Sequence, residues 1–129
     1  MRQPVPLDRC TRLLNHGPTV LVSAEHDGRR NVMAAAWSMP LDFTPPKVAV
    51  VLDKQTFTRE LILASDRFVL AVPTVTMAAL TDHVGDVSGR DVQKFTDVLA
   101  SAEPGPATGA PLVAGCIAWL ECQIGRAHV

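Results

Sequence analysis

The stretch TVLVSAEHDGRRNVMAAAWSM, residues 19–39, decides how the chain folds. Its first half, Thr19–Glu25, is mostly apolar, an Asp-Gly pair follows, and a second extended segment begins at Asn31. Two such segments joined by a short Asp-Gly turn predict an antiparallel β-hairpin. Alanine is a poor strand former and fills little volume. The three alanines at 34–36 therefore indicate that something other than side chains occupies the space above the return strand.

The rest of the chain alternates between strand and helix patterns. Helices are predicted over 7–17, 56–66 and 74–85, strands over 47–53, 67–74 and 112–123, and loops over 41–47 and 100–111. The segment 86–99 is predicted to begin as a glycine-bearing loop and to continue as a further helix, whose apolar face consists of Val92, Phe95 and Leu99. The continuous apolar run at 47–53 predicts a central strand that is buried on both faces. Because strands outnumber long helices and the first connection is a hairpin, the predicted fold is mainly β (α+β), an antiparallel barrel with peripheral helices.

Composition excludes several classes of function. The 129 residues include 12 basic and 13 acidic side chains, so charge does not favour nucleic acid or an anionic membrane as a partner. No apolar run is long enough to span a bilayer, and the N-terminus lacks the apolar region of a signal peptide, so we expect a cytoplasmic protein. The three cysteines and four histidines show no metal-ligand spacing, and Cys116 and Cys122 are expected to be buried thiols.

The last six residues, IGRAHV (124–129), do not continue the preceding strand pattern. They equal the in-frame translation of ATC-GGA-AGA-GCA-CAC-GTC. The preceding residue is Gln123, and a glutamine codon can end in AG. With AG in front of them, these six codons match the start of a widely used sequencing-adapter read. The hypothesis is that residues 1–123 are a domain incomplete at its C-terminus and that 124–129 are a non-native tail. The alternative is a genuine C-terminus that matches by chance.

Three segments carry groups that suit a flat ligand with an anionic end. In NVMAAAWSM (31–39), small side chains and backbone amides offer a low surface against which a flat group can lie. In DKQTFTREL (53–61), two threonine hydroxyls meet the start of a helix, where free N–H groups and the helix dipole favour an anion. VSGRDVQKF (87–95) is a glycine-containing loop that leads into a helix, with Ser88 and Lys94 as candidate phosphate donors.

Each segment also has an ordinary structural explanation. Alanines admit a neighbouring helix, threonines cap helices, and Lys94 is then a solvated side chain. Taken together, a flat apolar surface and two anion-friendly helix starts are what flavin mononucleotide (FMN) needs.

The chain resembles the flavin reductase-like family, the FMN-binding split-barrel proteins that include flavoredoxin-type members. The matching text is GPTVLVSAEHDGRRNVMAAAWSMPLDFTPPKVAVVLDKQTFTRELILASDRFVLAVP (17–73), followed by VSGRDVQKF (87–95), within a resemblance that runs from about Leu7 to Glu121. The resemblance implies a Greek-key split β-barrel, usually a homodimer, with FMN (sometimes FAD) near the subunit interface. It also implies a chain that extends past this C-terminus.

The resemblance further implies where the cofactor lies. The segment matching Asn31–Ser38 runs beside the isoalloxazine ring, that matching Asp53–Arg59 holds the ribityl phosphate, and that matching Ser88–Lys94 approaches from the following loop. The cofactor-binding candidates are Asn31, Met33, Ala34, Ala35, Ala36, Trp37, Ser38, Lys54, Thr56, Thr58, Ser88, Gly89 and Lys94. No catalytic acid or base and no metal ligand is predicted.

The activity that the resemblance implies is FMN-dependent oxidoreduction. NAD(P)H delivers hydride to the flavin, and electrons pass to free flavin, an oxygenase partner or another acceptor. The alternative is an FMN-binding electron carrier without NAD(P)H turnover, and a third is a shortened chain that binds nothing. The sequence does not separate these, because nicotinamide stacks on flavin without an obligatory motif.

Overall fold

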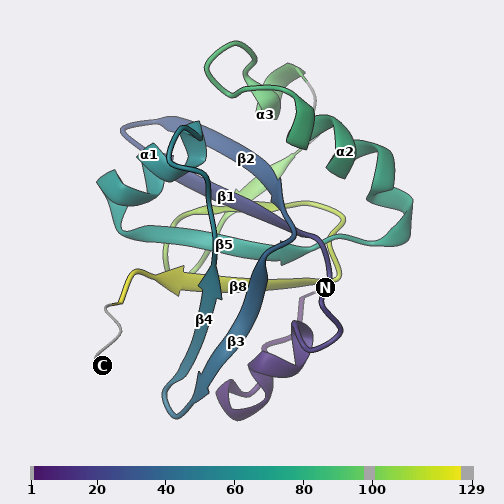
Figure 1. Cartoon of the computed structure of the whole chain (residues 1–129), viewed down its shortest axis with the longest axis vertical. Helices are drawn as coiled ribbons and strands as arrows, with labels where there is room; N and C mark the ends of the chain where they lie inside the picture. Colours follow the sequence, from purple (N-terminus) through teal and green to yellow (C-terminus); the bar gives the residue numbers. More distant parts are fainter. Residues whose placement is uncertain (1, 98–100, 126–129) are drawn as a thin grey trace.

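The computed structural model describes residues 2–97 and 101–125 and is built around a four-stranded antiparallel sheet in the order β2–β1–β5–β8 (Figure 1). The strands are β1 Val20–His26, β2 Arg29–Ala35, β5 Arg67–Val72 and β8 Ala118–Gln123. The predicted hairpin is confirmed, since β1 and β2 pair in register around a turn at Asp27 and Gly28. Both turn residues have positive φ, as a two-residue type I′ turn requires.

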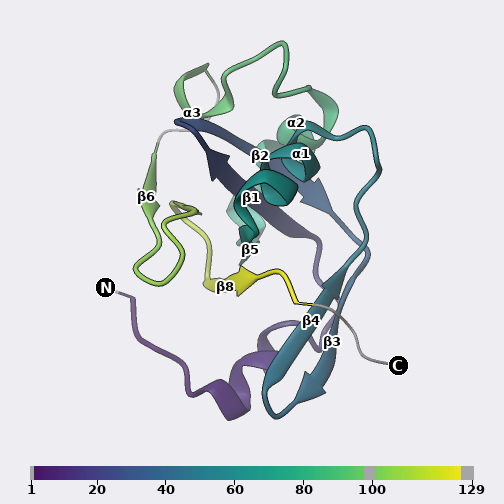
Figure 2. The ribbon, with the colours of Figure 1, turned by 90° about the vertical axis from the view of Figure 1, so that its left-hand side faces the viewer.

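Two small hairpins accompany the main sheet. β3 Ser38–Phe43 pairs with β4 Pro46–Val50, and this hairpin projects away from the main sheet (Figures 1 and 2). β6 Ala102–Pro104 pairs with β7 Pro111–Val113 on another side of the molecule. The predicted α+β class with antiparallel pairing is therefore confirmed.

The helices are short and lie at the periphery (Figure 1). They are α1 Phe57–Ser65, α2 Ala78–Asp86 and α3 Lys94–Asp97, with 3-10 turns η1 Leu7–Leu13 and η2 Val75–Met77. α1 ends at Asp66, which takes a left-handed conformation and donates its N–H to Ile62 O, a common way to satisfy a last-turn carbonyl.

Strand alternation divides the core into two layers. On one face of the sheet, Val20, Val22 and Leu70 pack against the apolar side of α1, represented by Leu61. On the other face, Leu21, Val69 and Val32 pack with Val84 of α2, Phe95 of α3 and residues of β7. The sheet is thus covered by α1 on one side and by α2, α3 and β7 on the other.

The prediction of a central strand at 47–53 is wrong. The segment forms β4, which pairs only with β3 among the described residues and is half-exposed, and Val51 beyond it is exposed. The central strand is β5, which pairs with both β1 and β8 and is buried from Phe68 to Val72. Both runs are continuously apolar, so only long-range pairing decides which one is central.

Other boundaries also differ from the sequence predictions. Residues 41–43, expected in a loop, extend β3, and the alanine-containing strand breaks after Ala35. The loop at 100–111 contains β6, and the expected last strand divides into β7 and β8 around Gly115, which has positive φ. The helix expected to follow the glycine loop within 86–99 is only α3 among the described residues, and Leu99 of its predicted apolar face lies outside them.

Candidate functional site

The candidate site lies along β2, which forms one edge of the main sheet. Among the described residues, β2 pairs only with β1, so the other side of its backbone faces no strand. Elements that follow in the chain approach this edge at both ends. Val51 donates its backbone N–H to Trp37 O (2.9 Å) beyond the end of β2, and Asn31 near its start contacts α1.

Asn31 joins two of the three predicted segments at a buried point. Its Nδ2 donates to Thr58 Oγ1 at 2.9 Å, and both side chains are buried. Its Oδ1 is also buried but has no hydrogen-bond partner among the described residues. A Cβ on Gly89, from the third segment, would overlap this oxygen and lie 2.7 Å from Nδ2. Strand, helix start and glycine loop therefore meet here, as the sequence suggested.

Lys94 fixes the third segment to the sheet. Its side chain is only 2% exposed, and Nζ donates to Val32 O of β2 (2.7 Å) and to Val84 O of α2 (2.9 Å). An ammonium group has three N–H donors, so two carbonyls leave one N–H unassigned. Burial lowers the pKa of Lys94 to about 8. The alternative that Lys94 is solvated is thus wrong, because its side chain is inside the protein.

Arg90, which the sequence analysis did not single out, connects the glycine loop to α1. Its guanidinium donates to Gln55 O (2.8 Å), pairs with Glu60, and lies 5.6 Å from the ring centre of Phe57. Arg29 stacks closer to that ring, at 4.6 Å. The only sequence signal was one arginine after a glycine, and a single loop charge is usually solvated.

The far end of β2 carries the most exposed candidates. Ala36 and Trp37 connect β2 to β3 and are exposed, Trp37 by 74%. Ser38 is half-buried, and its Oγ is a second buried polar atom without a partner. Thr81 Oγ1 of α2 is a third such atom. The oxygens of Asn31 and Ser38 lie near the start of β2 and just beyond its end.

The middle residues of this segment have packing roles. Ala34 lies where α2 comes close, since a Cβ on Gly85 would be 3.4 Å from the Cβ of Ala34. Ala35 is buried in the core layer that contains α1, and Met33 is half-buried against the same layer. Ala34 therefore admits a neighbouring helix, whereas Ala36 is open to a ligand.

The remaining polar candidates surround the turn before α1. Thr56 precedes the helix, but its hydroxyl donates to Asp53 O (2.9 Å) and makes no capping hydrogen bond. Lys54 is exposed in the same turn, while half-buried Ser88 accepts the backbone N–H of Arg90 at 3.2 Å. The free N–H groups of the first turn of α1 and the charge of Lys54 make this end suitable for an anion.

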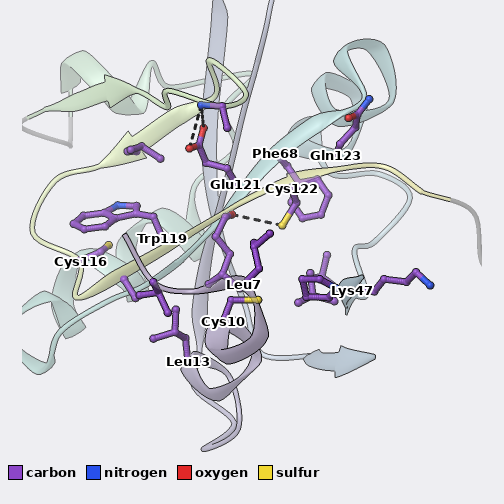
Figure 3. Close-up of a pocket in the computed structure, with 18 of the residues that line it drawn as sticks. Leu7, Cys10, Leu13, Lys47, Phe68, Cys116, Trp119, Glu121, Cys122 and Gln123 are labelled. Carbon is purple, nitrogen blue, oxygen red and sulfur yellow. Dashed lines mark hydrogen bonds between the residues drawn. The ribbon is translucent and has the colours of Figure 1, made fainter. Parts of the chain in front are cut away.

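A large groove of the described structure lies elsewhere (Figure 3). It measures about 1560 Å³ and runs between η1, β4 and β8, and it contains none of the thirteen candidates. All three cysteines line it, and burial raises the pKa of Cys116 to about 11 and that of Cys122 to about 12. The thiols of Cys116 and Cys122 are therefore protonated near neutral pH, and the described cysteines form no disulfide.

Two further features bear on function. No group of histidine, cysteine or carboxylate side chains in the described ranges could hold a metal ion. Within the same residues, no helix is long and apolar enough to cross a membrane.

The three segments that the sequence singled out thus meet beside β2 in an antiparallel α+β fold. The chain belongs to a known family, since residues 12–129 match the flavin reductase like domain. This confirms the family resemblance that the sequence motifs indicated.

Solved structures agree with the family assignment. An FMN-binding domain of a flavin reductases-like enzyme from Shewanella baltica is 49% identical with a TM-score of 0.90, over 95% of this chain and 65% of that one. Flavoredoxin of Desulfovibrio vulgaris (Miyazaki F) is 31% identical with a TM-score of 0.80, over 85% of this chain and 61% of that one.

A related protein is also longer than this chain. The uncharacterized protein YddH of Escherichia coli (strain K12) is 50% identical over 124 residues, which are 94% of this chain and 66% of that protein. The present chain therefore spans just under two-thirds of the length of YddH and of the Shewanella chain.

Proposed function

We propose that this protein binds FMN along the open edge of β2 and acts as an NAD(P)H-dependent, flavin reductase-like oxidoreductase. The observation that carries the proposal is two of the three buried oxygens without partners among the described residues, Asn31 Oδ1 near the start of β2 and Ser38 Oγ just beyond its end. Buried polar atoms are nearly always satisfied, so such a pair indicates a polar ligand. A flavin has donors and acceptors along its ring edge and therefore fits these residues.

In this proposal, the chain binds and orients the cofactor at three places. Asn31, Thr58 and the remaining N–H of Lys94 provide polar contacts, and Gly89 allows the close approach of its loop. The exposed indole of Trp37 offers an apolar surface for the ring. Bound FMN would supply the hydride and electron transfer chemistry, which requires no acid or base from the protein.

The phosphate of FMN is assigned to the turn before α1. The first N–H groups of this nine-residue helix have no intrahelical acceptors, and the helix dipole favours an anion there. Lys54 and the threonine hydroxyls lie in the same turn and helix start. FAD is the second cofactor to test, because the same turn could hold its pyrophosphate.

A homodimer is part of the proposal. Met39, Leu41 and Phe43 of the projecting β3–β4 hairpin are all more than half exposed, which is unusual for large apolar side chains in one short strand. A second copy of the chain would cover them. Sedimentation velocity over a range of concentrations tests this, and a species that remains monomeric at high concentration would refute it.

FMN titration, followed by flavin fluorescence and by retention through gel filtration, tests the central claim. Ala36→Leu and Trp37→Ala should each weaken FMN binding at least 10-fold without loss of thermal stability, because both residues are exposed. Val75→Ala, at a position 93% exposed and outside the candidate set, is the matched control. Failure of the unmodified protein to retain FMN would reject the proposal.

The second candidate function is an FMN-binding electron carrier, which the similarity to a flavoredoxin favours. Oxidation of NADH and NADPH with added FMN separates the two functions. A reductase should exceed the rate seen with free flavin alone, whereas a carrier should bind FMN and show only that background. The same assay, with free flavin or an oxygenase as acceptor, identifies where the electrons go.

A further inference from the structure

Thr81 of α2 carries a buried hydroxyl that the described part of the protein does not use. Its Oγ1 is shielded from solvent and makes no hydrogen bond to any described residue. A threonine hydroxyl inside a helix often bonds to the carbonyl four residues earlier, here Met77 O, but the Thr81 hydroxyl does not. Because buried polar atoms are nearly always satisfied, this hydroxyl indicates a polar group that binds beside α2.

Thr81 belongs to the side of α2 that is turned toward the sheet. The helix packs beside β2 (Figures 1 and 2), and Leu80, Thr81 and Val84 are its less exposed residues. Thr81 precedes Gly85 by four residues, and residues four apart lie on the same side of a helix. That side meets the strand at Gly85, where a Cβ would be 3.4 Å from the Cβ of Ala34. The Thr81 hydroxyl is thus on the β2 side of the helix.

The contacts with β2 indicate where along the strand Thr81 lies. Gly89, in the loop after α2, lies against Asn31 near the start of β2. Gly85, earlier in the chain, lies against Ala34 farther along the strand. The helix and its loop therefore run opposite to β2. One helical turn rises about 5.4 Å and two strand residues rise about 6.6 Å, so Thr81, one turn before Gly85, is about two residues beyond Ala34.

This position is level with Ala36, at the end of β2 that is open to solvent. Ala36 and Gly85 are both exposed, and neither has a side chain larger than a methyl group. Ser38, two residues beyond Ala36, has the other unpartnered oxygen at this end of the strand. Two hydroxyls from different elements, α2 and β3, therefore lack partners near the same small-residue surface.

We propose that Thr81 is a further FMN-binding residue, whose hydroxyl forms a hydrogen bond with a polar atom on the flavin ring edge where the ring passes Ala36. This inference rests on the proposed function and adds α2 to the elements that hold the cofactor. The ring edge of a flavin carries carbonyl oxygens and ring nitrogens. A threonine hydroxyl both donates and accepts, so it can satisfy either kind of atom.

Thr81→Val tests the proposal, because valine has nearly the shape of threonine but no hydroxyl. FMN titration, followed by flavin fluorescence, should show binding weakened at least about 5-fold, as expected for one lost hydrogen bond. The Tm of the FMN-free variant should stay the same or rise, because a methyl group replaces an unpaired buried hydroxyl. A structural hydroxyl would give the opposite change in Tm.

Two further variants serve as controls. Thr81→Ser keeps the hydroxyl and should bind FMN within about 2-fold of the unmodified protein. Thr76→Val removes a hydroxyl at an exposed position in η2, outside the candidate site, and should leave the affinity for FMN unchanged.

Three results would overturn the inference and leave the proposed function standing, since in each the unmodified protein still binds FMN. Equal affinity of Thr81→Val and the unmodified protein would show that water satisfies the hydroxyl. A lower Tm of FMN-free Thr81→Val would show that the hydroxyl stabilises the fold itself. Equal weakening by Thr81→Ser would assign the effect to the methyl group. Failure of the unmodified protein to retain FMN would instead reject both proposals.

Discussion

The two edges of the main sheet differ in what meets them. At β2, Asn31 donates to Thr58 of α1, Lys94 of α3 donates to Val32 O, and the buried oxygens of Asn31 and Ser38 lack partners among the described residues. At β8, the open edge borders a groove whose walls are mainly apolar, with charged side chains such as Arg59 and Glu121 among them. We propose only the first edge as the site of a polar organic ligand. The same element, a strand edge that is unpaired among the described residues, therefore has different surroundings in the two places.

The largest effect is expected where the glycine loop meets β2. Gly89→Ala would place a methyl group on Asn31 and disrupt its hydrogen bond to Thr58, with a loss of roughly 2–4 kcal/mol in unfolding free energy. Gly85→Ala is the matched control, because its Cβ would meet Ala34 at ordinary contact distance and alanine favours the helix. Urea denaturation measures both, and equal stabilities would show that the loop is not fixed against Asn31.

The buried ammonium of Lys94 should make stability depend on pH. Its pKa is lowered from 10.5 to about 8, so between these values the unfolded chain binds more protons than the folded chain, and stability rises with pH. The gain over pH 8–10 should be about 2 kcal/mol relative to Lys94→Met, which does not titrate. Denaturation of both proteins across this range tests it, and parallel pH profiles would contradict the lowered pKa.

A smaller effect is expected at the start of α1. Thr58→Val removes the acceptor of Asn31 Nδ2 inside the protein and should cost roughly 1–2 kcal/mol. Thr56→Val should cost less, because that hydroxyl is less buried and makes no helix cap. Thermal denaturation compares the two, and a larger loss at Thr56 would indicate that the cap, not the contact with β2, stabilises the helix.

The smallest effect on monomer stability is expected at the projecting hairpin. Phe43 is 76% exposed, so Phe43→Ser should change the unfolding free energy of the monomer by less than about 0.5 kcal/mol. If the hairpin mediates the proposed dimer, the same change should weaken self-association. Denaturation at low protein concentration and sedimentation at high concentration separate the effects.

Local sequence patterns predicted the elements that depend on near neighbours. The hairpin follows from an Asp-Gly turn between extended segments, and α1 follows from a helical run that ends at Asp66. The convergence of three segments was also predictable, although only the family resemblance linked segments so far apart. Arg90 was not found, because its partners Gln55 and Glu60 are at least 30 residues away.

The sequence by itself determined the hairpin, the main helix and the family. Only the tertiary structure decided that β5 is central, that Lys94 is buried, and that Ala34 faces a helix while Ala36 faces outward. The physical reason is the range of the interactions. Turn and helix preferences act within about four residues. Lys94, in contrast, donates to a carbonyl 62 positions away, and the order of the strands depends on pairing between segments that are also far apart in the sequence.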